Sequence, residues 1–337
     1  MKLNKKTFFQ IISFLLVLSV FLVPVFLIPQ INKNTQRTNP KEVFLELWNV
    51  DTFEGGKASR GAFLEKQAVN FQKTNTNVYI IVKNLSTEQA ELQLASGAVP
   101  DFVSYGIGAG KMFKTLCKDV KNFDVREDLK IPKVVPWCLG GYVLCSIKNI
   151  DLKDENAILN NTIGFGVKNT ICLSALNENV EEVGKLEKVY EKSKTAGYGE
   201  YNAYEDFLKQ EFDVLLGTQR DFFRLLNRIN LGALDSCKFN FLSGYSDLVQ
   251  WFSVLTDDEE KTKIIENFID FILSEDIQRK LVNIGMFSST GLLIYEDENY
   301  KKFEEAISKD LITISPFLDE FEIREKQNEM LNKIFRN

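Results

Sequence analysis

The feature that most constrains this chain is an alternation of strand and helix patterns over residues 43–104. Strand patterns occur at 43–48, 78–82 and 100–104, and amphipathic helix patterns occur at 60–73 and 87–96. Strands and helices that alternate at this spacing form right-handed crossovers on a parallel sheet. The sequence therefore predicts an α/β fold that begins with such a sheet.

Ligands of open α/β sheets bind beyond the carboxyl ends of the strands. Here those ends run from Trp48 to Gly56 and from Ser104 to Gly110. The second of these loops is rich in glycine but does not fit a phosphate-binding loop, because residues 105 and 112 are Tyr and Met. We interpret it as a strand-to-helix turn that offers backbone N–H groups to a ligand.

The same strand–turn–helix pattern occurs again later in the chain. A buried strand is predicted at 212–216, and the turn at 217–221 opens a helix. The amino terminus of a helix presents free N–H groups and partial positive charge, which suit hydroxyls or an anion. Arg220 lies in this turn, where it contacts a ligand or instead forms a salt bridge with Asp221 or Asp213.

An apolar run at 134–147 is interrupted by Gly140 and Gly141. This pattern predicts a long strand that bends while it crosses between two lobes. Trp137 in this run faces the cleft between the lobes or packs at the hinge, and the pattern leaves both open. Cys138 and Cys145 flank the glycine pair, and the sequence does not decide whether they form a disulfide.

Composition excludes several classes of function. The 337 residues carry a formal net charge of −6, which argues against a general nucleic-acid binder. The chain has no histidine, which excludes Ser-His-Asp and Cys-His catalysis and His-ligated zinc. Its five cysteines form no CxxC pair, which argues against a metal knuckle. No metal and no cofactor are expected. Carboxylate-pair chemistry remains, with Asp51 and Glu54 as candidates, but their place on one short loop disfavours opposed positions across a sugar.

The amino-terminal segment, 1–30, has a cluster of lysines followed by an uncharged apolar stretch at 7–28. That stretch is long enough to cross a bilayer as a helix. No small-x-small cleavage site precedes Lys33, so we expect an uncleaved signal anchor, with a cleaved signal peptide as the alternative. Residues 31–42 form a polar tether, and the rest of the protein is expected to be exported.

Several runs, in this order along the chain, resemble the sugar-type (family 1) extracellular solute-binding proteins of ABC importers. The likeness extends from about Val43 nearly to the end, although the lipobox cysteine that is usual in the family is absent and the second lobe is short. The runs are Leu47–Asp51 with Phe53–Gly56, Ala95–Ser104 with its G-x-x-P-D-hydrophobic motif, Trp137–Leu144, Leu215–Asp221 and Phe268–Ser288.

The resemblance implies a two-lobed, periplasmic-binding-protein-like fold of type II, preceded by the amino-terminal transmembrane helix. The expected organisation is lobe 1 at 43–141, lobe 2 at 142–238, a return to lobe 1 at 239–300, and carboxy-terminal helices on lobe 2 at 301–337. The lobes are expected to close on a solute. The implied ligand-binding residues are Trp48, Asp51, Glu54, Ser104, Tyr105, Thr218, Gln219, Arg220 and Tyr245.

The resemblance also implies a function without catalysis. The chain would act as a monomer, anchored in the cell membrane with its binding domain on the extracellular side. It would bind a carbohydrate or similar small polar solute and present it to the permease subunits of an ABC transporter. Aromatic faces and polar side chains of the kind implied are what sugar sites use. The alternative is a membrane-anchored sensory ectodomain that signals solute occupancy to a membrane partner such as a kinase.

Overall fold

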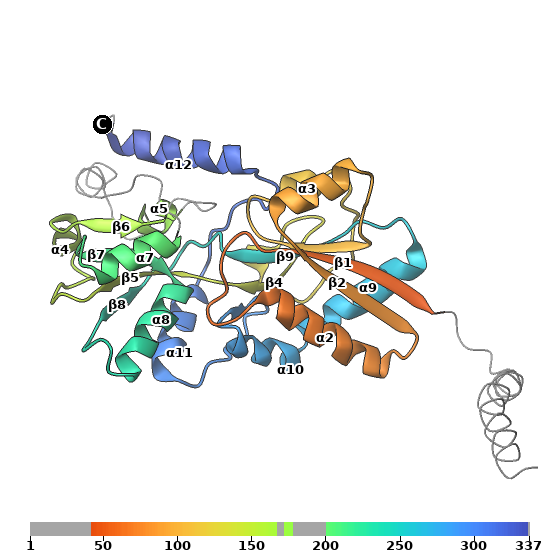
Figure 1. Ribbon diagram of the computed structural model, residues 1–337, viewed down its shortest axis with the longest axis horizontal. Helices are drawn as coiled ribbons and strands as arrows, with labels where there is room; N and C mark the ends of the chain where they lie inside the picture. Colours follow the sequence, from red (N-terminus) through yellow and green to blue (C-terminus); the bar gives the residue numbers. More distant parts are fainter. Residues whose placement is uncertain (1–41, 167–171, 178–199, 336–337) are drawn as a thin grey trace, which may run out of the picture. The chain divides into compact units, whose positions relative to one another are not determined.

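The computed structural model describes residues 42–166, 172–177 and 200–335, which contain two β-sheets with helices packed against them (Figure 1). The expected membrane segment at 1–30 and nearly all of the tether at 31–42 lie outside these ranges. Within the ranges that are described, no helix has both the length and the apolar character of a membrane span.

The first sheet has six strands in the order β10-β4-β9-β3-β1-β2. It is built mainly from apolar runs, and three of its inner strands, β3, β4 and β9, are buried along their whole length. The strands are β1 (Val43–Val50), β2 (Val78–Leu85), β3 (Phe102–Tyr105), β4 (Val135–Leu139), β9 (Val249–Val254) and β10 (Phe287–Ser288).

The expectation of a parallel sheet holds for only part of this sheet. Strands β1 and β3 are parallel, with Trp48 opposite Val103. Strand β9 is antiparallel to both β3 and β4, and β10 is antiparallel to β4. The sheet is mixed because β9, which comes late in the sequence, lies between two strands that come earlier in the sequence.

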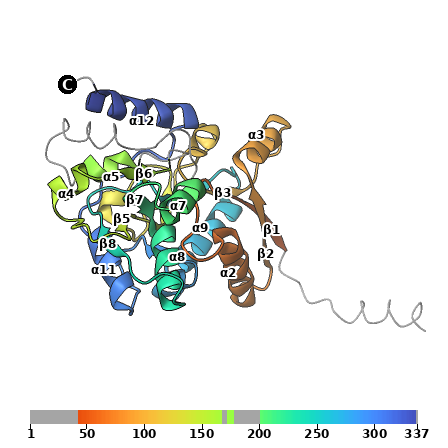
Figure 2. The same cartoon turned by 60° about the vertical axis from the view of Figure 1, so that its left-hand side comes forward.

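Helices cover both faces of the first sheet, with α3 on the face opposite α2 and α9 (Figures 1 and 2). Phe268 of α9 packs edge-on against Phe71 of α2 and Phe102 of β3, at centroid distances of 5.4 and 5.8 Å. We call this sheet with its helices the first lobe. Its helices are α2 (Arg60–Thr74), α3 (Thr87–Ala95), α9 (Glu259–Leu273), α10 (Glu275–Gln278) and the 3₁₀ turns η1 (Gly110–Phe113), η2 (Glu127–Leu129) and η3 (Arg279–Asn283).

The second sheet has four strands in the order β6-β7-β5-β8. Strand β5 is antiparallel to both β7 and β8, whereas β6 is parallel to β7. The chain enters this sheet through Gly140 and Gly141, which separate β4 from β5, and leaves it after Phe241. The strands are β5 (Tyr142–Ser146), β6 (Ile163–Phe165), β7 (Val214–Thr218) and β8 (Lys238–Phe241).

We call the second sheet with its helices the second lobe. Phe222 of α8 is fully buried in it, against Phe241 of β8 and Phe303 of α11 at centroid distances of 5.1 and 5.6 Å. The helices are α4 (Glu155–Leu159), α5 (Leu173–Asn177), α7 (Glu200–Leu208), α8 (Gln219–Asn230) and α11 (Glu298–Ile307).

The last helix, α12 (Glu320–Phe335), contacts elements of both lobes. It lies beside α5 (Figures 1 and 2). At its start, Lys111 of the first lobe forms ion pairs with Asp319 at 2.8 Å and Glu322 at 3.4 Å. Ile323 is buried against Ile107. The expected assignment of 301–337 to the second lobe alone therefore omits a contact with the first.

All five cysteines are free thiols. Cys138, in β4, belongs to the first sheet, and Cys145, in β5, belongs to the second. Both are fully buried. Burial raises the pKa of each of these thiols well above its ordinary value. They therefore behave as small buried apolar residues rather than as a disulfide pair.

Candidate functional site

Gln219, the first residue of α8, joins the two lobes where the chain crosses between them. Its backbone N–H donates to the carbonyl of Gly141 at 2.9 Å, and its side-chain Oε1 accepts from the amide of Gly141 at 3.1 Å. Its Nε2 donates to the carbonyl of Glu54, in the loop after β1, at 3.3 Å. A Cβ atom on Gly140 would lie 2.4 Å from Gln219 Oε1, so a larger residue at 140 would displace the Gln219 side chain.

A second link between the lobes is an ion pair between Glu54 and Arg220. Beside it, Lys57 Nζ lies over the rings of Phe223 and Tyr300, at 4.8 and 4.5 Å from their centroids. Burial lowers the pKa of Lys57. The sequence left open whether Arg220 contacts a ligand or an acid of its own lobe. Its ion pair is instead with the opposite lobe.

Asp221 fixes the start of α8. Its Oδ2 accepts from the amide of Thr218 at 2.9 Å, and its Oδ1 lies 3.9 Å from Arg224 Nη1. The carboxyl group is almost completely buried, and burial raises its pKa to about 6, against the lowering effects of Thr218 and Arg224. This contact holds the turn from β7 into α8, so that Gln219 and Arg220 meet the first lobe.

A polar cluster is buried at the carboxyl ends of β1 and β3. Ser104 Oγ accepts from Trp137 Nε1 and from Gln250 Nε2, each at 3.1 Å. Gln250 Nε2 also lies 3.3 Å from Asn49 Oδ1 and 3.4 Å from Asp51 Oδ1. Trp137 is fully buried, which agrees with its interpretation as a packing residue. The cluster lies where the fold places a ligand.

Arg60, the first residue of α2, completes this polar cluster. Its side chain is only 1% exposed. The Nε atom donates to Asp51 Oδ1 at 3.0 Å, and Nη2 donates to the carbonyl of Phe53. The guanidinium carbon also lies 3.9 Å from the centroid of the Phe53 ring. We refer to Asn49, Asp51, Arg60, Ser104 and Gln250 as the buried polar cluster.

The aromatic residues expected in the site lie inside the lobes. Trp48 is fully buried, and its Nε1 donates to Glu46. Tyr105 is fully buried, with its hydroxyl 3.0 Å from Ser253 Oγ. Tyr245 is also buried, and its ring stacks on Tyr142 at 6.4 Å. None of the three presents an exposed aromatic face in this conformation.

The expected residues therefore fall into three groups. Glu54, Gln219 and Arg220 come together between the lobes, with Thr218 directly before them. Asp51 and Ser104 belong to the buried polar cluster. The three aromatic residues are packed in cores.

Sequence reasoning missed Arg60 and Gln250. Gln250 is a polar residue in a strand that is buried throughout, where it stands between Val249 and Trp251. An isolated amide within an apolar run needs partners when it is buried, so this pattern was a usable signal. Arg60 gave no comparable signal, because a charged residue at the start of a helix is usually solvated.

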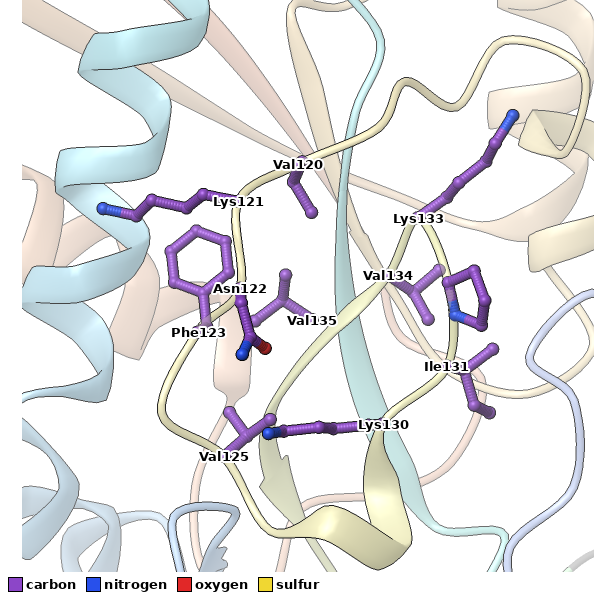
Figure 3. Close-up of a pocket in the computed structure, with 11 residues that line it drawn as sticks. Val120, Lys121, Asn122, Phe123, Val125, Lys130, Ile131, Lys133, Val134 and Val135 are labelled. Carbon is purple, nitrogen blue, oxygen red and sulfur yellow. The ribbon is translucent and has the colours of Figure 1, made fainter.

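A separate pocket of the first lobe has a volume of about 350 Å³ and is lined by residues 120–123, 125 and 130–135. Figure 3 shows the side chains that line it. Its walls combine apolar side chains such as Val134 with three lysines. Lys121 pairs with Asp270 and Lys130 with Glu127. The third lysine, Lys133, has a left-handed backbone conformation, with φ of 67°. None of the expected site residues lines this pocket.

Comparison with known proteins identifies the fold. No protein-family model matches the sequence, and no curated protein matches it. An ABC transporter protein from Clostridium perfringens is similar in structure, with 13% identity over 87% of this chain and 99% of that chain and a TM-score of 0.63. The GacH receptor of Streptomyces glaucescens, solved also in complex with acarbose, has 13% identity over 88% and 94% of the two chains and a TM-score of 0.60.

A third similar structure is the spermidine/putrescine ABC transporter substrate-binding protein PotD from Streptococcus pneumoniae. It has 11% identity over 88% of this chain and 99% of that chain, with a TM-score of 0.59. At these identities the likeness concerns the fold alone. The chain therefore has the two-sheet, periplasmic-binding-protein-like α/β fold expected from its sequence.

Proposed function

We propose that this chain is the extracellular solute-binding component of an ABC transporter, without catalytic activity of its own. The observation that carries this proposal is the junction at Gln219, where the start of α8 contacts both the crossing at Gly141 and the loop after β1. A small change at this crossing would alter how the two lobes meet. The similar solved structures, which include transporter substrate-binding proteins, support the proposal.

The solute is proposed to be a carbohydrate or a similar small polar molecule that binds between the lobes. Its contacts would come from Asp51, Glu54 and Ser104 on one side, and from Thr218, Gln219 and Arg220 on the other. Binding would favour the closed arrangement, because the solute contacts both lobes only there. Permease subunits in the cell membrane would then recognise the closed form. The amino-terminal segment would anchor the protein on the extracellular side.

We expect a bound solute to raise the melting temperature. A solute at 100 times its Kd stabilises the folded state by about 2.7 kcal/mol, which corresponds to roughly 5–10 °C in a domain of this size. Differential scanning fluorimetry with maltose, glucose, xylose, glucuronate, spermidine and sulfate measures this shift, and chromatography checks that no product forms. Folded protein that responds to none of these, or that hydrolyses a sugar, would contradict the proposal.

Two variants locate the binding site in the same assay. Gln219→Ala removes the side-chain contacts to Gly141 and Glu54 and should reduce the shift. Lys133→Ala changes the separate pocket of Figure 3 and should leave the shift unchanged. The opposite pattern would place the solute in that pocket.

The Glu54–Arg220 ion pair should favour closure in the absence of solute by no more than about 1 kcal/mol, because both side chains are partly exposed, at 46% and 33%. We expect Glu54→Gln to increase the solute-free radius of gyration measured by small-angle X-ray scattering, and 0.5 M salt to act in the same direction on the wild type. Glu275→Gln removes an exposed ion pair with Arg279 within one lobe and serves as the control. Equal radii for all three proteins would show that the pair does not affect closure.

A further inference from the structure

Two atoms of the buried polar cluster have no hydrogen-bond partner among the residues that the structure describes. They are Arg60 Nη1, a donor, and Gln250 Oε1, an acceptor. Both side chains are almost completely buried, at 1% and 0% exposure. Leaving a buried polar atom unpaired is unfavourable, so each such atom in a native protein needs an explanation. One unpaired donor and one unpaired acceptor in the same cluster indicate a missing group that accepts one hydrogen bond and donates another.

The two atoms belong to residues that share one neighbour. Arg60 Nε lies 3.0 Å from Asp51 Oδ1, and Gln250 Nε2 lies 3.4 Å from the same oxygen. The Asp51 side chain is 34% exposed, whereas Arg60 is buried. Asp51 is therefore the member of the cluster that borders solvent, on the loop that leads to Glu54 and the second lobe.

The charges within the cluster restrict what can bind there. The positive charge of Arg60 is balanced by the carboxylate of Asp51 at 3.0 Å. The other members, Asn49, Ser104 and Gln250, are neutral. An anion or a cation placed beside this balanced pair would bring a buried charge without a partner, which is unfavourable. An uncharged group adds no such penalty.

A hydroxyl group meets both requirements, because it accepts one hydrogen bond and donates another. A carboxylate accepts only, and an ammonium group donates only. We infer that Arg60 Nη1 and Gln250 Oε1 form a subsite for a hydroxyl group of an uncharged, polyhydroxylated solute. Arg60 donates to the hydroxyl oxygen, and the hydroxyl donates to Gln250. This inference rests on the proposed function and names the class of solute.

The first experiment is isothermal titration calorimetry on the full chain with maltose, glucose and xylose as neutral probes, and glucuronate, spermidine and sulfate as charged ones. We expect binding of at least one neutral sugar and weaker or absent binding of the charged probes. Tighter binding of a charged probe would overturn the inference but leave the solute-binding function intact. Binding of none of the six would contradict the proposed function itself.

The second experiment changes the two residues. Arg60→Lys keeps the positive charge beside Asp51 but removes Nη1, and should weaken binding of the best neutral sugar by about 10- to 100-fold. Arg279→Lys, at an exposed ion pair, should leave binding unchanged. If Arg60→Lys is folded and binds as tightly as the wild type, a buried water occupies the position and the inference is wrong.

Gln250→Met tests the acceptor, with Gln278→Met as a matched control. Both glutamines are fully buried. All the polar atoms of Gln278 have partners within the protein: Nε2 donates to the carbonyls of Trp137 and Ile272, and Oε1 accepts from Ser288. Gln278→Met should therefore lower the melting temperature without weakening sugar binding, whereas Gln250→Met should weaken sugar binding. Equal effects of both variants on binding would contradict the subsite.

A third measurement does not depend on whether the variants fold. Monodeoxy analogues of the best neutral sugar are titrated against the wild type. Loss of one particular hydroxyl should cost about 10- to 100-fold in affinity, because it leaves Arg60 and Gln250 unpaired again. In Arg60→Lys or Gln250→Met, whichever folds, the same deletion should cost less than in the wild type, whereas in the controls Arg279→Lys and Gln278→Met it should cost as much as in the wild type. Equal, small losses at every position would overturn the inference.

Discussion

Replacing Phe222 with alanine should lower the free energy of unfolding by about 3–5 kcal/mol. The ring is fully buried and lies at the centre of the second lobe. It meets Phe239, Phe241 and Tyr300 edge-on, at centroid distances of 4.9, 5.1 and 5.3 Å. Truncation removes these contacts and leaves a cavity among rings that are held by the sheet and by α11.

Urea denaturation followed by circular dichroism measures this loss. Phe321→Ala is the matched control, because that ring is 67% exposed and its removal should change stability by no more than about 0.5 kcal/mol. A loss below about 1 kcal/mol for Phe222→Ala would mean that the aromatic packing of the second lobe differs from the one described.

The stability of the wild type relative to Asp221→Asn should fall by about 2–3 kcal/mol as the pH rises from about 4 to about 6.5. Burial raises the pKa of Asp221 from 3.8 to about 6. The folded protein therefore holds this proton more tightly than the unfolded chain does. Its stabilising effect is complete below about pH 4 and is lost as the pH passes through about 6. Asparagine does not titrate, so the variant lacks this dependence.

Asp213 provides a control of opposite sign. Burial raises the pKa of Asp213, but hydrogen bonds from Lys148 and Thr162 outweigh this effect and lower it overall. The stability from Asp213 is therefore present above its unfolded pKa and is lost as the pH falls. Urea titrations at about pH 3, 4, 5, 6 and 7 should show Asp221→Asn gaining stability relative to the wild type as the pH rises above about 4. Asp213→Asn should instead lose stability relative to the wild type as the pH rises from about 3 to about 4, and should run parallel to it above that. A profile of Asp221→Asn parallel to that of the wild type above about pH 4 would disprove the assignment of a raised pKa to Asp221.

Local sequence patterns were sufficient to predict most of the helices and strands of the first lobe. The helices expected at 60–73 and 87–96 occur as α2 and α3. Periodicity depends on neighbours within a few residues, and it identifies elements without showing which strands pair. The insertion of β9 between β3 and β4 depends on residues far apart in the sequence, and no local pattern indicates it.

The sequence likewise predicted part of the candidate site, namely the approach of its two turns, but not the orientation of its side chains. The turns at Glu54 and Gln219 were expected to approach each other, and the structure brings them into contact. The aromatic residues Trp48 and Tyr105 were expected to line the site, but both are buried in the first lobe. In strands buried on both faces, alternation does not reveal which side chains face a ligand. Arg60 was missed because burial of a charge becomes visible only once its partners are known.

The position of β9 also bears on the order in which the protein folds during synthesis. The strands of the second sheet lie together between residues 142 and 241, so that sheet can assemble once its own residues have left the ribosome. The first sheet begins at Val43 but has no strand between β3 and β4 until residue 254 has been made. Until then the edge of β3 that pairs with β9 stays unpaired. Nascent chains with an unpaired strand edge bind chaperones or aggregate.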